Sequence, residues 1–232
     1  MTRLNLITAT GCRPAAWSIC ERLMRAQDYV GSVRWIIVDD GEFAQPVTFA
    51  RPDWEIEVVR PLPHWRPGQN TQSRNLLVAL DCIEPGARVA VIEDDDYYAP
   101  GYLADVAHWL DRADLVGEGR ARYYNLRSDR FAQMQNERHA SLCSTAVKGD
   151  GFHALRAAAQ THAQFIDLQL WATRGLRSEI HNTHHVVGIK GLPGRAGIGC
   201  GHDDSFGLID NLDMLHNWIG VDAQIYRAHR GA

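Results

Sequence analysis

The sequence lacks a long hydrophobic run, and this absence argues against a membrane-spanning protein. No apolar segment in the 232 residues approaches the roughly 18 residues that a spanning helix needs. The first twelve residues, MTRLNLITATGC, contain too short an apolar region for a signal peptide. We therefore expect no membrane partner and a cytoplasmic location.

Cysteine is scarce, and its spacing does not match that of a zinc site. The five cysteines, at positions 12, 20, 82, 143 and 200, include no C-x-x-C pair. An odd number without that spacing favours free thiols in a reducing compartment over a disulfide framework or a zinc site.

An excess of positive charge is also missing. The formal net charge of −4 argues against a protein whose whole surface binds nucleic acid or membranes, although a local basic patch is compatible with it. Two phosphate-binding signatures are absent as well. GIKGLPGRAG has no Gly-Lys-Ser/Thr at the spacing of a Walker A loop, and GEGRAR lacks the third glycine of a dinucleotide fingerprint.

The first 112 residues do contain an alternation of short apolar strands and amphipathic helices. This alternation predicts an α/β fold with a mostly parallel sheet flanked by helices, in one domain over residues 1–232. Strands are expected at 4–9, 33–38, 55–59 and 89–92, and helices from Pro14, from Asn70 or Thr71, and from Pro100.

The second half, residues 113–232, is less regular. Residues 120–139 are rich in arginine and aromatics and indicate loops or irregular strands. A helix is expected at 165–174, a strand within 177–187, a glycine-rich loop at 188–202, and a final amphipathic helix carrying the apolar residues between 208 and 219.

An acidic cluster follows the fourth expected strand. In VIEDDDYYAP, Glu93, Asp94, Asp95 and Asp96 are adjacent, and their charges repel one another where the strand leaves the core. Such a run often forms a solvated turn. Here it falls at the strand ends where parallel sheets bind ligands, and carboxylates are the preferred ligands of Mg²⁺ and Mn²⁺. The cluster therefore favours a metal-bound phosphate compound.

Several segments, in order, resemble the family 2 glycosyltransferases of the GT-A fold. LNLITATGCRP resembles the opening strand and helix start of that family, and WIIVDDGE resembles its second strand with an aspartate pair. GQNTQSRN resembles its segment before the next helix, VIEDDDYYAPGYL its D-x-D region, and IDLQLWATRG the helix that carries its catalytic base. The resemblance covers roughly residues 4–190.

The resemblance implies a role for each matching residue. The donor would be a nucleotide sugar, with a UDP-sugar expected first, and Mn²⁺ or Mg²⁺ would be the cofactor. Residues 1–112 would form the donor half and 113–232 the acceptor and catalytic half. Asp95 would be the first metal ligand, with Glu93 at the outer position, and Asp167 would be the base of an inverting reaction. The residues expected to bind the donor in the first half are Thr8, Asp39, Asp40, Arg74 and Asp94.

The C-terminal third adds histidines and a glycine-rich loop. Some GT-A enzymes take a third metal ligand from a C-terminal histidine, and the sequence leaves His185 and His202 open as alternatives. Lone histidines are more often ordinary polar or core residues. Lys190 and Arg195 lie in the glycine-rich loop and are expected to contact the diphosphate of the donor.

The acceptor is expected to contact the second half. Basic and aromatic residues alternate in GRARYYNLRSDRF, and this pattern would suit an anionic or base-containing acceptor such as a modified base in DNA, as in some phage-encoded relatives. The location would then be the host cytoplasm. Arg122, Tyr123 and Tyr124 are the acceptor-binding candidates. The alternative is an ordinary surface of ion pairs, which the interspersed acids favour.

Two other functions are compatible with the same pattern. A sugar-nucleotide nucleotidyltransferase shares the sheet and the metal chemistry, but the glycine-rich signature with a lysine that such enzymes carry near the first strand is incomplete in TATGCRPA. The other is a non-catalytic module that binds a nucleotide sugar or nucleic acid.

Overall fold

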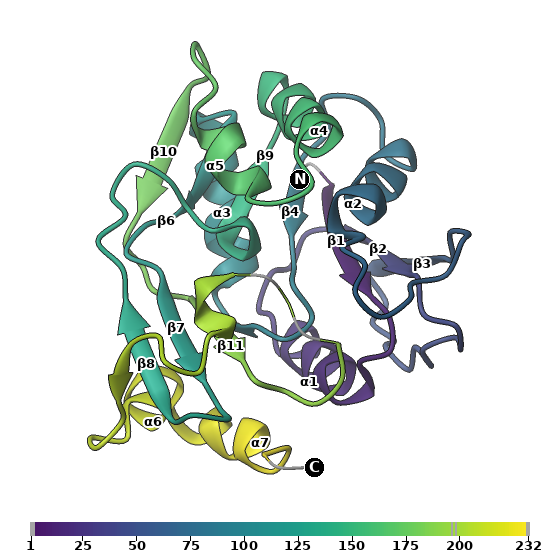
Figure 1. Cartoon of the computed structure of the whole chain (residues 1–232). Helices are drawn as coiled ribbons and strands as arrows, with labels where there is room; N and C mark the ends of the chain where they lie inside the picture. The colour runs from purple at the N-terminus through teal and green to yellow at the C-terminus, as the bar shows by residue number, and fades with distance from the viewer. Residues whose placement is uncertain (1–2, 196, 198, 231–232) are drawn as a thin grey trace.

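A seven-stranded sheet forms the centre of the molecule (Figure 1). The structure is a computed structural model that describes residues 3–195, 197 and 199–230. Antiparallel pairing is confined to β9, which runs against β4 and β6, so the predicted α/β class with a mostly parallel sheet is confirmed. In sheet order the strands are β10 (Ser178–His181), β6 (Leu115–Glu118), β9 (Thr145–Val147), β4 (Val89–Val91), β1 (Leu4–Thr10), β2 (Val33–Asp39) and β3 (Trp54–Val59).

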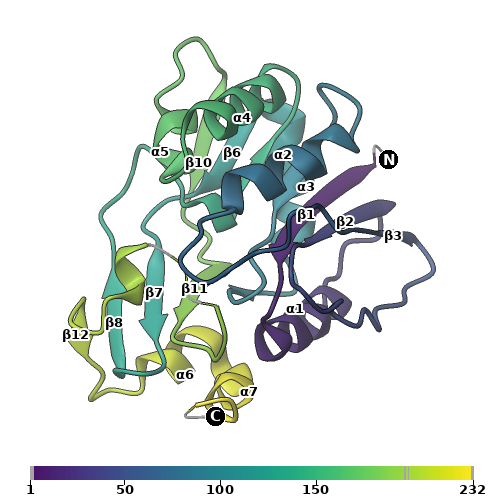
Figure 2. The same ribbon diagram turned by 45° about the vertical axis from the view of Figure 1, so that its right-hand side comes forward.

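Helices cover both faces of this sheet (Figure 2). The strands are apolar on both sides: Trp35 and Ile37 face one hydrophobic cluster, and Ile36 faces the other. Both clusters contain residues from each half of the chain, so the halves on either side of residue 112 share one core. One face packs against α1 (Pro14–Arg25) and α3 (Tyr102–Arg112), and the other against α2 (Gln72–Asp81), α4 (Asp150–Thr161) and α5 (Ile166–Trp171).

A second sheet of five short strands lies beside the first, and the sequence did not predict it. Residues 120–139, expected as loops or irregular strands, contain a regular hairpin, and residues 188–190 of the expected glycine-rich loop belong to a strand. Residues 196 and 198 of that loop lie outside the described residues. The strands, in sheet order, are β12 (Leu208–Ile209), β8 (Arg130–Gln133), β7 (Arg122–Asn125), β11 (Val186–Lys190) and β5 (Tyr97–Tyr98).

The C-terminal end of the chain is divided into shorter elements than expected. The apolar residues between 208 and 219 do not form one helix, because β12 takes up the first of them and α6 begins only at Met214. The remaining short elements are α6 (Met214–Ile219), α7 (Ala223–Arg227), and the 3₁₀ turns η1 (Leu142–Ser144), η2 (Cys200–His202) and η3 (Gly220–Asp222). Across the described part of the chain, every helix is too short or too polar to cross a membrane.

Gly11 determines how closely β1 and β2 can end beside each other. Its φ is +142°, and a Cβ placed there would lie 2.6 Å from both Oδ1 of Asp40 and the backbone nitrogen of Gly41. We expect Gly11→Ala to lower the free energy of unfolding by about 2–4 kcal/mol, measured by urea denaturation. Gly175→Ala is the matched control, since φ is +84° there and no atom lies within 4 Å. A similar loss in both variants would show that the close contact with Asp40 is unimportant.

Candidate functional site

A cavity of about 350 Å³ lies beyond the carboxyl ends of β1 and β4. It is the position at which open α/β sheets bind ligands. The cavity brings together most of the site residues that the sequence predicts, including members of both halves of the chain. Its charged or titratable lining residues are Arg13, Glu93, Asp94, Asp95, His139, Asp167, Lys190, Arg195 and His202, together with Tyr123 and Cys143.

Arg13 holds two carboxylates of the acidic cluster. Its Nη1 donates to Oδ1 of Asp94 at 2.7 Å, and its Nη2 donates to Oδ2 of Asp95 at 2.6 Å. The hydroxyl of Thr10 donates to the other oxygen of Asp94, also at 2.7 Å. Arg13 directly precedes α1, so a residue that looks like an ordinary helix-flanking arginine in the sequence is a counter-ion of the site.

Lys190 supplies the second buried cation. Its Nζ lies 2.8 Å from Oδ1 of Asp96, 3.8 Å from Oδ2 of Asp95 and 3.9 Å from Oε2 of Glu93. The lysine is the last residue of β11, in the second sheet, whereas the acids follow β4 in the first. Two cations thus face four adjacent carboxylates, and the cluster keeps an excess of negative charge.

The pKa values of the acids reflect this excess. Burial, together with the charge of Asp96, raises the pKa of Glu93 to about 8, and burial raises the pKa of Asp94 to about 6 in spite of Arg13. Burial acts on Asp95 as well, but Arg13 and Lys190 outweigh it and lower the pKa of Asp95 below its usual value. Asp95 therefore keeps its charge, while Glu93 is poised to take up a proton unless a further cation approaches.

The donor atoms of the cluster fit a divalent cation. Ligand atoms of Glu93, Asp96 and Cys143 lie within 4.8 Å of one another, and Oδ2 of Asp96 is buried without a hydrogen-bond partner among the described residues. Carboxylate oxygens are the ligands that Mg²⁺ and Mn²⁺ prefer. Glu93 was predicted as a ligand, but Asp96 and Cys143 were not. No spacing in the sequence connects Cys143 to the acids, and η1 brings it to them.

The two candidate histidines are separated by the fold. His202 lines the cavity, and burial together with Lys190 lowers its pKa to about 4, so its imidazole is neutral and able to bind a metal. The ring of His185 instead shares a hydrogen bond of 2.8 Å with Oδ2 of Asp105 on α3 and is absent from the cavity lining. Of the two, His202 is the one that lies at the acidic cluster.

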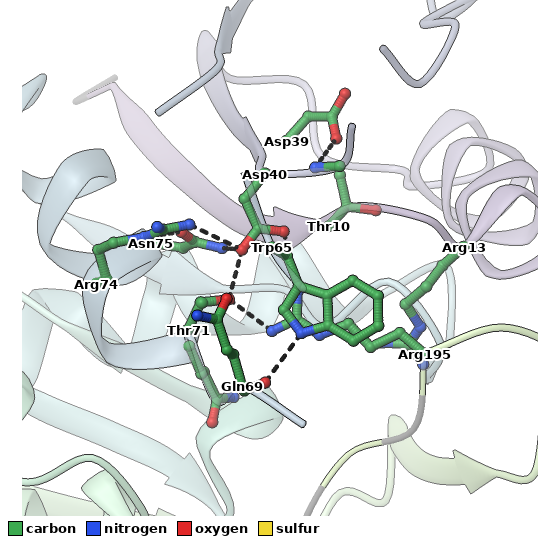
Figure 3. A network of polar contacts seen from close by, with 12 residues as sticks. Thr10, Arg13, Asp39, Asp40, Trp65, Gln69, Thr71, Arg74, Asn75 and Arg195 are labelled. Carbon is green, nitrogen blue, oxygen red and sulfur yellow. Dashed lines mark hydrogen bonds and ion pairs between the residues drawn. The ribbon is translucent and has the colours of Figure 1, made fainter. Parts of the chain in front are cut away.

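Asp40 accepts hydrogen bonds from four side chains, three of them at the start of α2 and the fourth, Arg195, from the second half of the chain (Figure 3). Nδ2 of Asn75 donates at 2.8 Å and Nη2 of Arg74 at 3.1 Å, and the hydroxyl of Thr71 donates to the same oxygen. Nη1 of Arg195 donates to the other oxygen at 2.9 Å. Asp40 is fully buried, so this network fixes the end of β2 to the start of α2.

Arg195 extends this network across the chain. Its guanidinium lies over the indole of Trp65, 4.9 Å from the ring centroid, and its Nη2 donates to the hydroxyl of Thr71 at 2.6 Å. The contact holds the glycine-rich segment of the second half against the first half, as Figure 3 shows. Trp65 was not predicted as a site residue, and Thr71 was predicted only as a possible helix start.

Four predicted donor residues are absent from the cavity lining: Asp40 and Arg74 belong to the Asp40 network, and Asp39 and Thr8 lie outside both. Both oxygens of Asp39 accept backbone N–H groups, from Gly41 at 2.9 Å and from Gln45 at 2.7 Å, so Asp39 shapes the loop after β2. The hydroxyl of Thr8 is buried and accepts from Nε1 of Trp35 at 2.9 Å. Neither side chain is part of the cavity lining.

Asp167 lines the same cavity as the acidic cluster. It lies in the first turn of α5, directly after Phe165 and Ile166. Burial raises the pKa of Asp167, and its charge contributes to the raised pKa of Glu93. A carboxylate with a raised pKa that opens into a cavity is suited to take up a proton.

The predicted acceptor residues are only partly brought together. Tyr123 lines the cavity, and its hydroxyl shares a hydrogen bond of 2.6 Å with Oγ of Ser141. Tyr124 is buried and donates to Oδ1 of Asp129 at 3.3 Å. The guanidinium of Arg122 lies over the indole of Trp218, 5.4 Å from its centroid.

Three other arginines of this stretch also bind within the chain: Arg120 to Glu137, Arg127 to Asp204, and Arg130 to the carbonyl of Gly207. Two of these contacts are ion pairs of the kind that the alternative, an ordinary surface, predicts.

Comparison with known proteins adds a likeness of fold. No family model matches this sequence, and no curated protein matches it. Among solved structures, Staphylococcus aureus TarS is 13% identical with a TM-score of 0.56, over 82% of this chain and 37% of TarS. TarS 1–349 in complex with UDP-GlcNAc is 14% identical with a TM-score of 0.55, over 85% of this chain and 60% of that one.

A mannosyltransferase gives a similar result. PcManGT from Pyrobaculum calidifontis, in complex with GDP-Man and Mn²⁺, is 16% identical with a TM-score of 0.55, over 82% of this chain and 57% of that one. This chain therefore spans less than two thirds of the structures that it resembles. These likenesses confirm the expected fold of GT-A type, and at such identities they show the fold alone.

Proposed function

We propose that this chain is a glycosyltransferase that moves a sugar from a nucleotide-sugar donor to an acceptor hydroxyl. The observation that carries the proposal is the cavity itself, which gathers the acidic cluster at the end of β4 and the carboxylate of Asp167. Two structures of similar fold support it, since one is bound to UDP-GlcNAc and the other to GDP-Man with Mn²⁺.

The donor would bind along the edge formed by β1, β2 and β4. Arg13, Lys190 and Arg195 are the lysine and arginines of the described cavity lining, and they would contact the anionic diphosphate. The Asp40 network and Trp65 adjoin Arg195, and the nucleoside would extend toward them. A UDP-sugar is the first donor to test.

Glu93, Asp95 and Asp96, with His202 beside them, would hold Mn²⁺ or Mg²⁺. When bound, the ion would offset the negative charge that develops on the departing diphosphate. Without a ligand, Arg13 and Lys190 neutralise part of the negative charge of the acidic cluster, because they bind Asp95 and Asp96.

Asp167 would act as the general base. Its carboxylate takes the proton of the acceptor hydroxyl as the oxygen bonds to the anomeric carbon and the bond from that carbon to the diphosphate breaks. Attack from the side opposite the diphosphate inverts the anomeric carbon. A binding module would have no need of Asp167, so the variant Asp167→Asn separates the two functions.

A ligand screen tests the donor part of the proposal. We expect one of UDP-glucose, UDP-GlcNAc and GDP-mannose to raise the melting temperature in the presence of Mn²⁺, and EDTA to remove the effect. A donor at 100 times its Kd stabilises the folded state by about 2.7 kcal/mol. Asp95→Asn should abolish the Mn²⁺-dependent part, and Asp53→Asn, an exposed acid outside the cavity, should leave it unchanged. If no nucleotide or nucleotide sugar shifts the melting temperature with Mn²⁺ present, the proposed function is wrong.

A further inference from the structure

The part of the cavity around Asp167 differs in chemistry from the donor part. The three cations of the lining, Arg13, Lys190 and Arg195, all lie at the acidic cluster or the Asp40 network. The lining residues next to Asp167 in the chain, Phe165, Ile166 and Leu168, are apolar, and neither a lysine nor an arginine is among the charges that act on the pKa of Asp167.

The uncharged polar groups on this side are already engaged within the chain. Nδ2 of Asn136 donates to the carbonyl of His139 at 2.8 Å, and its Oδ1 accepts from the backbone N–H of Ala121 at 2.9 Å. The hydroxyl of Ser141 is hydrogen-bonded to that of Tyr123. A ligand that enters here therefore meets an apolar surface with two titratable groups, Asp167 and His139.

Phe165 is exposed at this surface in an unfavourable backbone conformation. Its φ is +53° and its ψ is 44°, in the left-handed region that bulky side chains rarely adopt. The side chain lines the cavity, yet 52% of Phe165 is exposed, and 44% of Leu168 beside it. Strain of this kind is kept where the surroundings or a function require it. Burial of the Phe165 ring cannot account for it, because half of the residue remains exposed.

We propose that the acceptor is a small, uncharged molecule with a flat apolar ring that bears the reacting hydroxyl, and that Phe165 and Leu168 form its binding surface. This inference rests on the proposed function and names its acceptor class. A polyanion would find neither lysine nor arginine beside Asp167, and a sugar would find few hydrogen-bonding groups there that are not already paired within the chain. A flat ring needs stacking contact and one polar partner, and both are present.

Binding of model acceptors tests the proposal. The probes are 2-naphthol, methyl β-D-glucopyranoside and a 12-nucleotide oligodeoxythymidine, titrated into the full chain by calorimetry with and without Mn²⁺. We expect 2-naphthol to bind most tightly. Phe165→Ala should weaken its binding about three- to tenfold, and Phe165→Tyr should preserve it. Phe43→Ala is the matched control, because Phe43 is 82% exposed and lies outside the cavity lining.

Two further measurements separate a loss of fold from a loss of contact. Phe165→Gly removes both the ring and the backbone strain, so it should bind 2-naphthol as weakly as Phe165→Ala without a lower melting temperature. Nucleotide-sugar binding, followed by the Mn²⁺-dependent shift, should be retained in every Phe165 variant.

If the donor binds but the affinity for 2-naphthol is the same in Phe165→Ala as in the unchanged chain, the acceptor inference is overturned while the proposed function stands. The same holds if the sugar or the oligonucleotide binds more tightly than 2-naphthol. If no donor binds, the proposed function fails regardless of 2-naphthol.

Discussion

Asp167→Asn should lower the turnover of the chain about 10²- to 10⁴-fold while leaving donor binding intact. The asparagine side chain has nearly the size and shape of aspartate, so the first turn of α5 should be preserved. It cannot take up the proton of the acceptor hydroxyl, and that is the role proposed for Asp167. Turnover would be measured as release of the nucleoside diphosphate, and donor binding as the Mn²⁺-dependent rise in melting temperature.

The pH dependence of turnover provides the second measure of this role. Burial raises the pKa of Asp167, and the base must be deprotonated to act. The rate should therefore fall as the pH drops through a value above the ordinary aspartate pKa of about 3.8, and this acidic limb should vanish in Asp167→Asn.

Asp150→Asn is the control, since Asp150 occupies the first turn of α4 but lies outside the cavity lining. Unchanged turnover in Asp167→Asn would assign the base elsewhere or favour a binding module.

The fold of the first half could be predicted because its strands and helices are marked by local patterns. The residues from Trp35 to Val38 are apolar on both faces, as expected for a strand buried between two helical layers, and Pro14 opens α1 where the pattern places it. The second sheet could not be predicted in this way. Its strands have two to five residues, and apart from the β7–β8 hairpin they are held by partners far apart in the chain, such as Val187 beside Arg122.

A site residue could be predicted where it directly follows a predicted strand and precedes the next predicted helix. The acids after β4 belong to this class. Thr71 shows the limit: it does precede α2 as expected, but its hydroxyl donates to Asp40 and makes no cap hydrogen bond with the helix. The choice between His185 and His202 was equally inaccessible, because it depends on how β11 and the following loop lie against α3 and the acidic cluster.

Lys190 shows how a residue from the second sheet stabilises the site of the first. It is one of only two lysines in the sequence, and its side chain is almost completely buried against Asp96. We expect Lys190→Met to lower the free energy of unfolding at pH 8 by about 3–5 kcal/mol, because the methionine fills the space but leaves Glu93 and Asp96 without their cation and Asp95 with Arg13 alone. The measurement is urea denaturation without divalent cations.

The loss should shrink as the pH is lowered. Without Lys190, the pKa values of the buried acids would rise further above their unfolded values than they already do for Glu93 and Asp96. A group with a raised folded-state pKa contributes stability below its unfolded pKa and loses that contribution as the pH rises through the folded one. At pH 5 the acids of the variant would therefore hold protons and the deficit should be smaller, and at pH 8 Mn²⁺ should restore part of it by replacing the missing charge.

Lys148→Met, at the other lysine, is the matched control. Lys148 is partly exposed just before α4 and lies outside the cavity lining, so its replacement should change the free energy of unfolding by no more than about 0.5 kcal/mol. Equal losses in the two variants, or a loss in Lys190→Met that is the same at pH 5 and pH 8, would mean that Lys190 does not neutralise the acidic cluster. Lys190 binds the carboxylates that are proposed as metal ligands. The effect of Lys190→Met on stability therefore also measures the negative charge that a metal ion would neutralise at this site.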